Sequence, residues 1–275
     1  MNNGNFILVN GSFISSADYR ISILESEGLL FSEKIRSIRT TFAFFNESLE
    51  MIRLKLLIFH QSFPELIENE GTELKRQMGR TLTKNKHFLG SILSVRFWLS
   101  EQKLQYSIQS NKTESTGFEL NTKGLYIAIS RDVRKSFSSL SKCSLGSEMY
   151  WNIASIQPKE SFINEFVLIN YEDKITETPQ SNIYVIKNGV IKGASSQHGA
   201  YSDMTKSLML TIFETLKIKF SETNGLTIAD LNDAEEIFLV NSLDGIRWVI
   251  GFEGKRYFNQ NIRKINNLFV KSTAN

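Results

Sequence analysis

Residues 175–191 constrain the fold of this chain more than any other stretch. The β-branched and aromatic run at 183–186 (Ile-Tyr-Val-Ile) predicts a strand. Asn188 and Gly189 follow it, and this pair tolerates the positive φ angles of a two-residue hairpin turn. Glu177 precedes the strand, at a bend where a chain entering a sheet can direct one side chain inward. Because a single glutamate beside a strand is usually solvated, its role depends on the sequence around it.

The composition favours a globular protein from a reducing compartment. With 275 residues, of which 41% are hydrophobic, the chain can bury the core of one large domain or of two modest ones. The single cysteine, Cys143, excludes an intramolecular disulfide framework, which fits a cytoplasmic setting. We expect no secretory signal at residues 1–13, and no membrane span, because no apolar stretch is long enough.

The charge distribution argues against a nucleic-acid partner. The formal net charge is only +3, and basic residues are interspersed with acidic ones rather than gathered in a block. The aromatic pair Phe97 and Trp98 lies beside Arg96, but we expect these rings to pack on a strand. The three histidines are far apart in the sequence and have no metal-ligand spacing, so no metal site is predicted.

Strand and helix signals alternate along the whole chain. Asn10-Gly11 predicts an opening hairpin, and the apolar spacing from 49 to 59 predicts a helix capped by Asn46 and closed by Pro64. Other strands are predicted at residues 29–39, 89–98, 104–108, 125–129, 165–170 and 236–241. Other helices are predicted at residues 72–84, 150–160, 203–217, 226–231 (opening after Thr227) and 259–269.

The mixture of strands and helices predicts an α/β (α+β) protein of two domains. Residues 110–122 are rich in Asn, Thr, Ser and Glu, which is typical of a linker. We therefore expect a small N-terminal α/β domain at 1–115, a linker at 116–122 and a larger C-terminal α/β domain at 123–275.

Four segments in this order resemble the fold-type IV (class IV) pyridoxal-phosphate enzymes, which include branched-chain aminotransferases, D-amino-acid aminotransferases and aminodeoxychorismate lyases. Residues 31–36 (Phe-Ser-Glu-Lys-Ile-Arg) are similar to the family's Leu-Phe-Glu-Thr-Ile-Arg segment. Arg53-Leu54 resembles its His-x-x-Arg-Leu helix, with Glu50 in place of the histidine. Glu177 with residues 181–184 resembles its Glu-…-Ser-Asn-Ile-Phe segment, and residues 241–249 resemble a late segment of lyase-like members.

This resemblance implies the family's architecture, with a pyridoxal phosphate cleft between two domains. Glu177 matches the carboxylate that keeps the cofactor's ring nitrogen protonated. Arg53 matches the arginine that binds the cofactor's phosphate. The helix start at Ser202, Asp203 and Met204 matches the phosphate cup, and Ser242 matches a further contact.

The family reaction also requires a lysine that forms a Schiff base with the cofactor. Counted back from the predicted strand at 165–170, this lysine falls at Ser144, which has no amine. Lys142 is the alternative, because side chains two apart on an extended chain share a face about 7 Å apart, which a lysine stem can span. Asp203 adds a negative charge to the phosphate cup, and Thr205 replaces an arginine that often follows it.

These departures leave alternative functions open. A catalytically impaired homologue keeps the fold and binds an amino-acid-like or phosphate-bearing ligand without turning it over. An active aminotransferase or aminodeoxychorismate lyase uses Lys142 instead. An interaction protein that uses the dimer fold as a scaffold is a third class. In each case the resemblance implies a homodimer.

Overall fold

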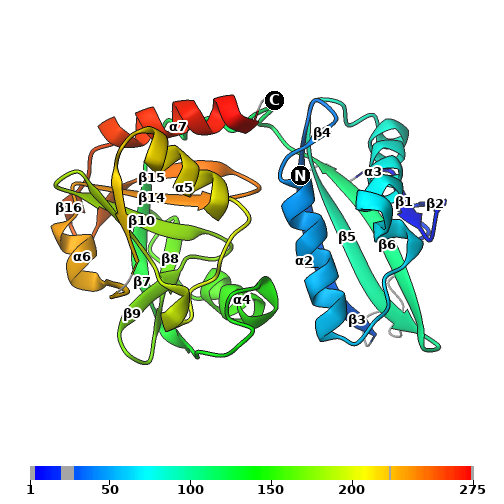
Figure 1. Ribbon diagram of the computed structural model, residues 1–275, viewed down its shortest axis with the longest axis horizontal. Coiled ribbons are helices and arrows are strands. Elements are labelled where there is room, and N and C mark those ends of the chain that lie inside the picture. The colour runs from blue at the N-terminus through cyan, green and yellow to red at the C-terminus, as the bar shows by residue number, and fades with distance from the viewer. Residues whose placement is uncertain (1–3, 20–27, 223, 274–275) are drawn as a thin grey trace. The chain divides into compact units, whose positions relative to one another are not determined.

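The computed structural model describes residues 4–19, 28–222 and 224–273, and the chain forms two compact units (Figure 1). The N-terminal unit is Met1–Gly117 and the C-terminal unit is Phe118–Asn275. Each unit has its own sheet.

The N-terminal unit contains a six-stranded antiparallel sheet of order β2-β1-β6-β5-β3-β4. The predicted opening hairpin is confirmed, with Asn10 at φ 45° and Gly11 at φ 84° in the turn. Phe97 and Trp98 are buried on β5, as expected. The strands are β1 Phe6–Val9, β2 Ser12–Ser15, β3 Leu29–Ile38, β4 Thr41–Phe42, β5 Gly90–Ser100 and β6 Lys103–Lys112.

Two helices pack against this sheet, α2 (Phe45–Ile58) against β3 and α3 (Thr72–Asn85) against β1 and β6. The apolar spacing placed α2 correctly, since Leu49, Ile52 and Leu56 are buried. The predicted cap is wrong, because the chain enters the helix directly from β4 and Asn46 already lies in its first turn. Strand β6 also extends to Lys112, into the stretch expected to be a linker.

The C-terminal unit is built on a ten-stranded mixed sheet of order β12-β11-β10-β14-β15-β7-β8-β9-β13, in which β16 pairs with β15. The β11–β12, β15–β7 and β7–β8 pairs are parallel. The predicted hairpin at Asn188-Gly189 joins β10 to β11. The strands are β7 Leu125–Lys135, β8 Glu165–Asn170, β9 Lys174–Glu177, β10 Asn182–Lys187, β11 Val190–Gly193, β12 Lys219–Ser221, β13 Leu226–Thr227, β14 Glu236–Asn241, β15 Gly245–Phe252 and β16 Lys255–Arg256.

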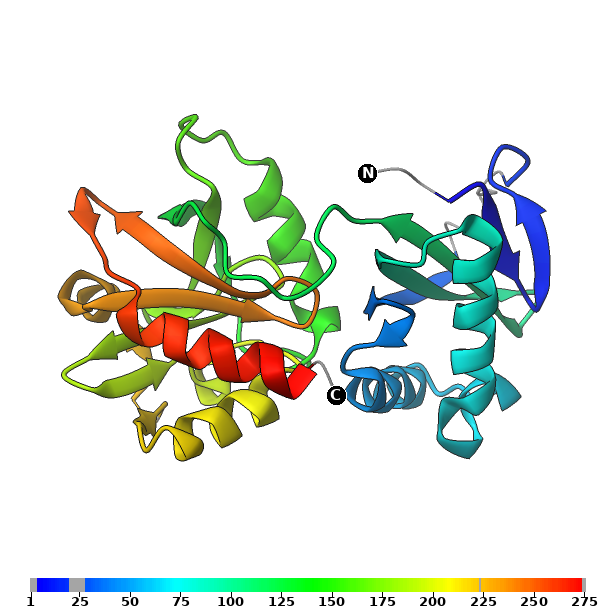
Figure 2. The same cartoon turned by 90° about the horizontal axis from the view of Figure 1, so that it is seen from above.

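Four helices accompany this sheet, α4 (Glu148–Ile156), α5 (Lys206–Thr215), α6 (Ile228–Asp233) and α7 (Gln260–Thr273). Helix α4 packs on β7 and β8, while α5 and α7 lie side by side, with α7 along β14 and β15 (Figure 2). Helix α6 opens with a capping box between Thr227 and Asp230, which explains the correct prediction of its start. Among the described helices, none has the length and apolar character needed to cross a membrane.

Strand β7 is longer than predicted and carries a large irregularity. Ile129 pairs with Val167 of β8, but the next aligned pair is Arg134 with Ile169, so β7 carries extra residues between these points. The predicted strand ended at Ile129 because the bulge interrupts the sequence pattern there. The observed strand continues to Lys135. As a result, Lys135 is fully buried.

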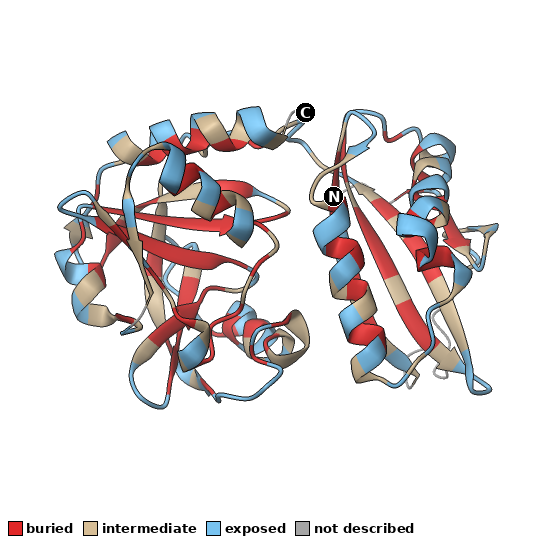
Figure 3. Ribbon diagram, in the orientation of Figure 1, coloured by how far each residue is buried: buried red, intermediate tan, exposed pale blue. Residues whose placement is uncertain are grey.

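Buried residues of the C-terminal unit include two apolar clusters (Figure 3). The larger cluster gathers apolar side chains of the central strands around Val185, Leu239 and Val249. The smaller cluster lies between α4 and β8 and includes Trp151 and Tyr201. Their rings meet edge to face with centroids 4.9 Å apart, which fixes two residues that also contact the polar site.

Candidate functional site

The centre of the site is the carboxylate of Glu177, the last residue of β9, which is fully buried. Its oxygen Oε1 accepts hydrogen bonds from Lys135 Nζ at 2.6 Å and Trp151 Nε1 at 3.1 Å. Its oxygen Oε2 accepts from Lys135 Nζ at 2.8 Å and the Tyr201 backbone N–H at 2.7 Å. A carboxylate offers about four lone-pair sites, so these contacts use its acceptor capacity in full.

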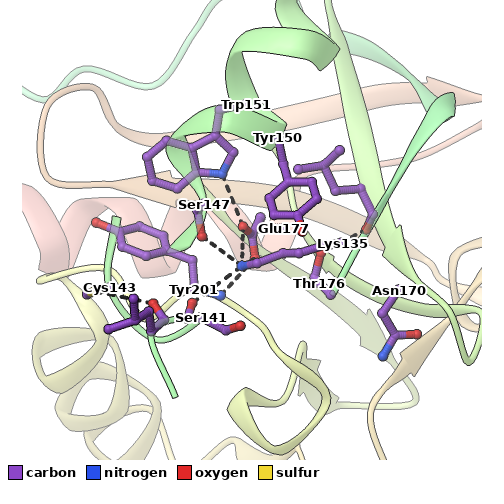
Figure 4. A network of polar contacts seen from close by, with 12 residues as sticks. Lys135, Ser141, Cys143, Ser147, Tyr150, Trp151, Asn170, Thr176, Glu177 and Tyr201 are labelled. Carbon is purple, nitrogen blue, oxygen red and sulfur yellow. Dashed lines mark hydrogen bonds and ion pairs between the residues drawn. The ribbon is translucent and has the colours of Figure 1, made fainter. Parts of the chain in front are cut away.

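The partner of Glu177 is Lys135, and the pair is fully buried (Figure 4). The ammonium group also donates to Ser147 Oγ at 2.7 Å and to the Ser141 carbonyl at 3.3 Å. Burial lowers the pKa of Lys135, and the adjacent Glu177 carboxylate opposes that shift. Both charges are therefore held in a closed network of hydrogen bonds, which is the condition for tolerating an ion pair away from water.

Sequence reasoning missed Lys135. It ends the charged run Arg131-Asp132-Val133-Arg134-Lys135, which reads as a solvated segment after a strand that stops at Ile129. The available signal was indirect, because a glutamate directed into a core requires a cation or several donors. Only the irregular β7 register, which the sequence does not reveal, brings this lysine to Glu177.

A second buried carboxylate, Asp203, lies on the segment before α5. Its oxygen Oδ1 accepts from the Thr205 N–H at 2.9 Å and from Thr205 Oγ1 at 2.7 Å. Its oxygen Oδ2 accepts from Tyr201 Oη at 3.3 Å and from Ser242 Oγ at 3.5 Å. These bonds compete with helical ones, so α5 begins at Lys206 rather than at Asp203 as predicted.

Because Asp203 is a buried ionisable group, we expect the stability of the folded protein to depend on pH. Burial raises its pKa from 3.8 to about 6, against the opposing effect of the Thr205 hydrogen bonds. The folded state therefore holds more protons than the unfolded state in that window, and this group removes stability as the pH rises from 3.8 to about 6. Asparagine keeps the contacts to Thr205 and can donate to the two hydroxyl oxygens without carrying a charge.

We therefore expect Asp203→Asn to raise the free energy of unfolding at about pH 8 by roughly 1–3 kcal/mol relative to the original protein. The difference should shrink as the pH falls from about 6 and vanish below 3.8, where Asp203 is protonated in both states. Urea unfolding of both proteins across this pH range measures it. Parallel pH profiles for the two proteins would show that Asp203 does not titrate in this environment.

The other predicted site residues of the C-terminal unit differ in their exposure and in their hydrogen bonds. Ser202 donates its backbone N–H to the Lys142 carbonyl at 3.1 Å, while the side chain of Lys142 is exposed. Met204 is half-buried between Asp203 and Thr205. Ser144 begins a short 3-10 turn, and its Oγ is buried without a hydrogen-bond partner among the described residues. The structure therefore brings together Glu177, Asp203 and Ser242. Lys135 contacts Glu177, and Tyr201 contacts both Glu177 and Asp203.

Arg53 belongs to the N-terminal unit. It lies on α2, where its guanidinium binds Glu50 at 2.7 Å and the Ile67 carbonyl at 2.9 Å. Within the part of the chain that is described, no cluster of His, Cys, Asp and Glu side chains could hold a metal ion.

Two α/β units, with a buried glutamate that precedes the β10–β11 hairpin of the second, are the arrangement that the resemblance to fold-type IV enzymes implies. Residues 60–250 match the amino-transferase class IV family, and the chain belongs to that family. Over 113 residues it is 25% identical to a protein of Methanocaldococcus jannaschii described as a branched-chain-amino-acid aminotransferase, a match that covers 41% of this chain and only 39% of that protein.

Solved structures share the fold over nearly the whole chain. The branched-chain amino acid aminotransferase of Escherichia coli has a TM-score of 0.83 at 15% identity, covering 98% of this chain and 94% of its own. A Legionella pneumophila structure titled as a 4-amino-4-deoxychorismate lyase has a TM-score of 0.75 at 17% identity, covering 93% and 96%. The predicted fold-type IV architecture is thus confirmed.

Proposed function

We propose that this chain is a catalytically impaired member of the class IV family, whose cofactor site is filled by its own side chains. Pyridoxal phosphate, when bound, supplies an electron sink that needs a carboxylate at its ring nitrogen. The residues around Glu177 do not fit that group, because Lys135, Trp151 and Tyr201 already use the acceptor sites of the carboxylate.

The contact between Lys135 and Glu177 carries this proposal. The ring nitrogen and the aldehyde carbon of pyridoxal phosphate lie at opposite ends of its ring. A lysine amine that contacts the carboxylate directly therefore occupies the place of the ring itself, and it is not at the position where an amine meets the aldehyde. Cofactor binding would require the ring nitrogen to displace Lys135 from Glu177, and the buried ammonium would then lose its carboxylate.

The predicted Schiff-base position supports the same proposal. Ser144 offers a hydroxyl, which cannot form an imine with an aldehyde. Lys142 is the alternative amine. Its side chain is exposed, and its backbone carbonyl accepts a hydrogen bond from the Ser202 N–H. No described contact brings Lys142 to either carboxylate.

The test combines activity with binding. We expect no keto acid from branched-chain amino acids or D-alanine, no pyruvate from aminodeoxychorismate, and no change of unfolding temperature with pyridoxal phosphate. The matched control is Lys142→Arg, which keeps the positive charge but cannot form an imine. Turnover by the original protein that disappears in Lys142→Arg would establish the active alternative.

The proposal includes a cytoplasmic homodimer that binds an amino-acid-like ligand without converting it. The single cysteine supports the compartment, and the family resemblance supports the dimer and the ligand class. Light scattering after size-exclusion chromatography measures the assembly state.

A further inference from the structure

Asp203 is a buried carboxylate that forms no ion pair within the part of the chain that the structure describes. It is 4% exposed, and its partners include the backbone N–H groups of Thr205 and Ser242 and the hydroxyl groups of Thr205, Tyr201 and Ser242. We call this set of donors, from Tyr201, Thr205 and Ser242, the anion cradle. Neutral donors converging from three residues on one buried anion are the kind of arrangement that also binds an oxyanion ligand.

The anion cradle is tied to the Lys135–Glu177 pair through one residue. Tyr201 donates its backbone N–H to Glu177 at 2.7 Å and its hydroxyl to Asp203 at 3.3 Å. Asn182 reinforces the link, because its Nδ2 donates to the Tyr201 carbonyl at 2.6 Å and its Oδ1 accepts the Asp203 N–H at 3.0 Å. The three buried charged groups, one ammonium and two carboxylates, thus belong to one network.

We propose that Asp203 is a built-in occupant of the anion cradle and that its side chain excludes phosphate from it. The carboxylate uses the donors, and its negative charge repels a second anion. Beside the Glu177 carboxylate, Lys135 and Asp203 then supply one internal cation and one further internal anion, which correspond to the charges of a pyridinium ring and a phosphate ester. This inference deepens the proposed function, because both charged ends of the site are then filled by the chain itself.

Three proteins test this inference with inorganic phosphate as the probe. Asp203→Gly removes the side chain and opens space, whereas Asp203→Asn removes the charge and keeps the volume, so it is the matched control. Phosphate should raise the unfolding temperature of Asp203→Gly in a saturable way, relative to chloride at equal ionic strength. We expect its apparent phosphate affinity, from calorimetric titration, to be at least about tenfold above that of the original protein and of Asp203→Asn.

Two outcomes would overturn the inference. A folded Asp203→Gly protein without a phosphate response would show that the donors do not accept an external anion. Equal responses in all three proteins would show an adventitious ion only. If Asp203→Gly does not fold, Asp203→Ser supplies the same comparison with a smaller opening. These titrations contain no pyridoxal phosphate, so their result is independent of the activity test. Turnover by the original protein would overturn the proposed function, whereas the phosphate response alone decides this inference.

Discussion

Lys135→Met is expected to lower the free energy of unfolding by about 3–5 kcal/mol, because it leaves the buried Glu177 carboxylate without its cation. Methionine approximates the volume of the lysine stem, so the loss reports the charge rather than a cavity. Ser147 Oγ and the Ser141 carbonyl also lose a partner. Urea unfolding at neutral pH, followed by tryptophan fluorescence, measures the change.

A double-mutant cycle identifies the cause of that loss. Glu177→Gln removes the charge and keeps one acceptor oxygen, which can serve either Trp151 or Tyr201, because these two donors bind different oxygens of the carboxylate. The double variant Lys135→Met with Glu177→Gln should therefore be more stable than the sum of the two single losses predicts, by at least about 1–3 kcal/mol. A Lys135→Met loss below about 1 kcal/mol, or additive single losses, would contradict a closed ion pair.

The N-terminal unit contains a second buried pair, and Lys55→Met is expected to cost about 3 kcal/mol. Lys55 Nζ lies 2.7 Å from Glu33 Oε2, donates to the Ser32 carbonyl at 3.3 Å and stands over the Phe31 ring at 5.4 Å. Only 1% of the lysine side chain and 7% of the glutamate side chain are exposed, so water cannot replace the lost cation.

The matched control for Lys55 is an exposed pair of equal geometry. Lys187 binds Asp233 at 2.8 Å, but the two side chains are 47% and 63% exposed. Lys187→Met should therefore change the free energy of unfolding far less than Lys55→Met does. Chemical denaturation of the three proteins under one set of conditions gives the comparison. Equal losses in the two variants would show that burial does not set the value of these pairs.

Much of the fold could be predicted because local signals and tertiary packing agree. The two-residue turns at Asn10-Gly11 and Asn188-Gly189 fix their hairpins, and the strand patterns at 165–170 and 236–241 coincide with β8 and β14. Errors fall where side chains override the pattern. Strand β15 was not predicted, and the start of α5 is displaced by the hydrogen bonds of Asp203.

The site was only partly predictable. Glu177 and Asp203 were predicted through the family resemblance rather than from their local patterns, and both are buried as ionisable groups. Lys135 could not be found in this way, because its burial depends on extra residues in β7 that have no characteristic sequence pattern. The presence of Lys135 in the site therefore depends on one register shift in β7, which the composition does not predict.

Trapping with pyridoxal phosphate and borohydride tests the central claim most directly. The full-length protein is incubated with equimolar pyridoxal phosphate and reduced, and its intact mass and peptides are measured. We predict an unchanged intact mass, with Lys135 recovered unmodified because it is paired with Glu177. A stoichiometric pyridoxyl adduct on Lys135 or on Lys142 would contradict the account.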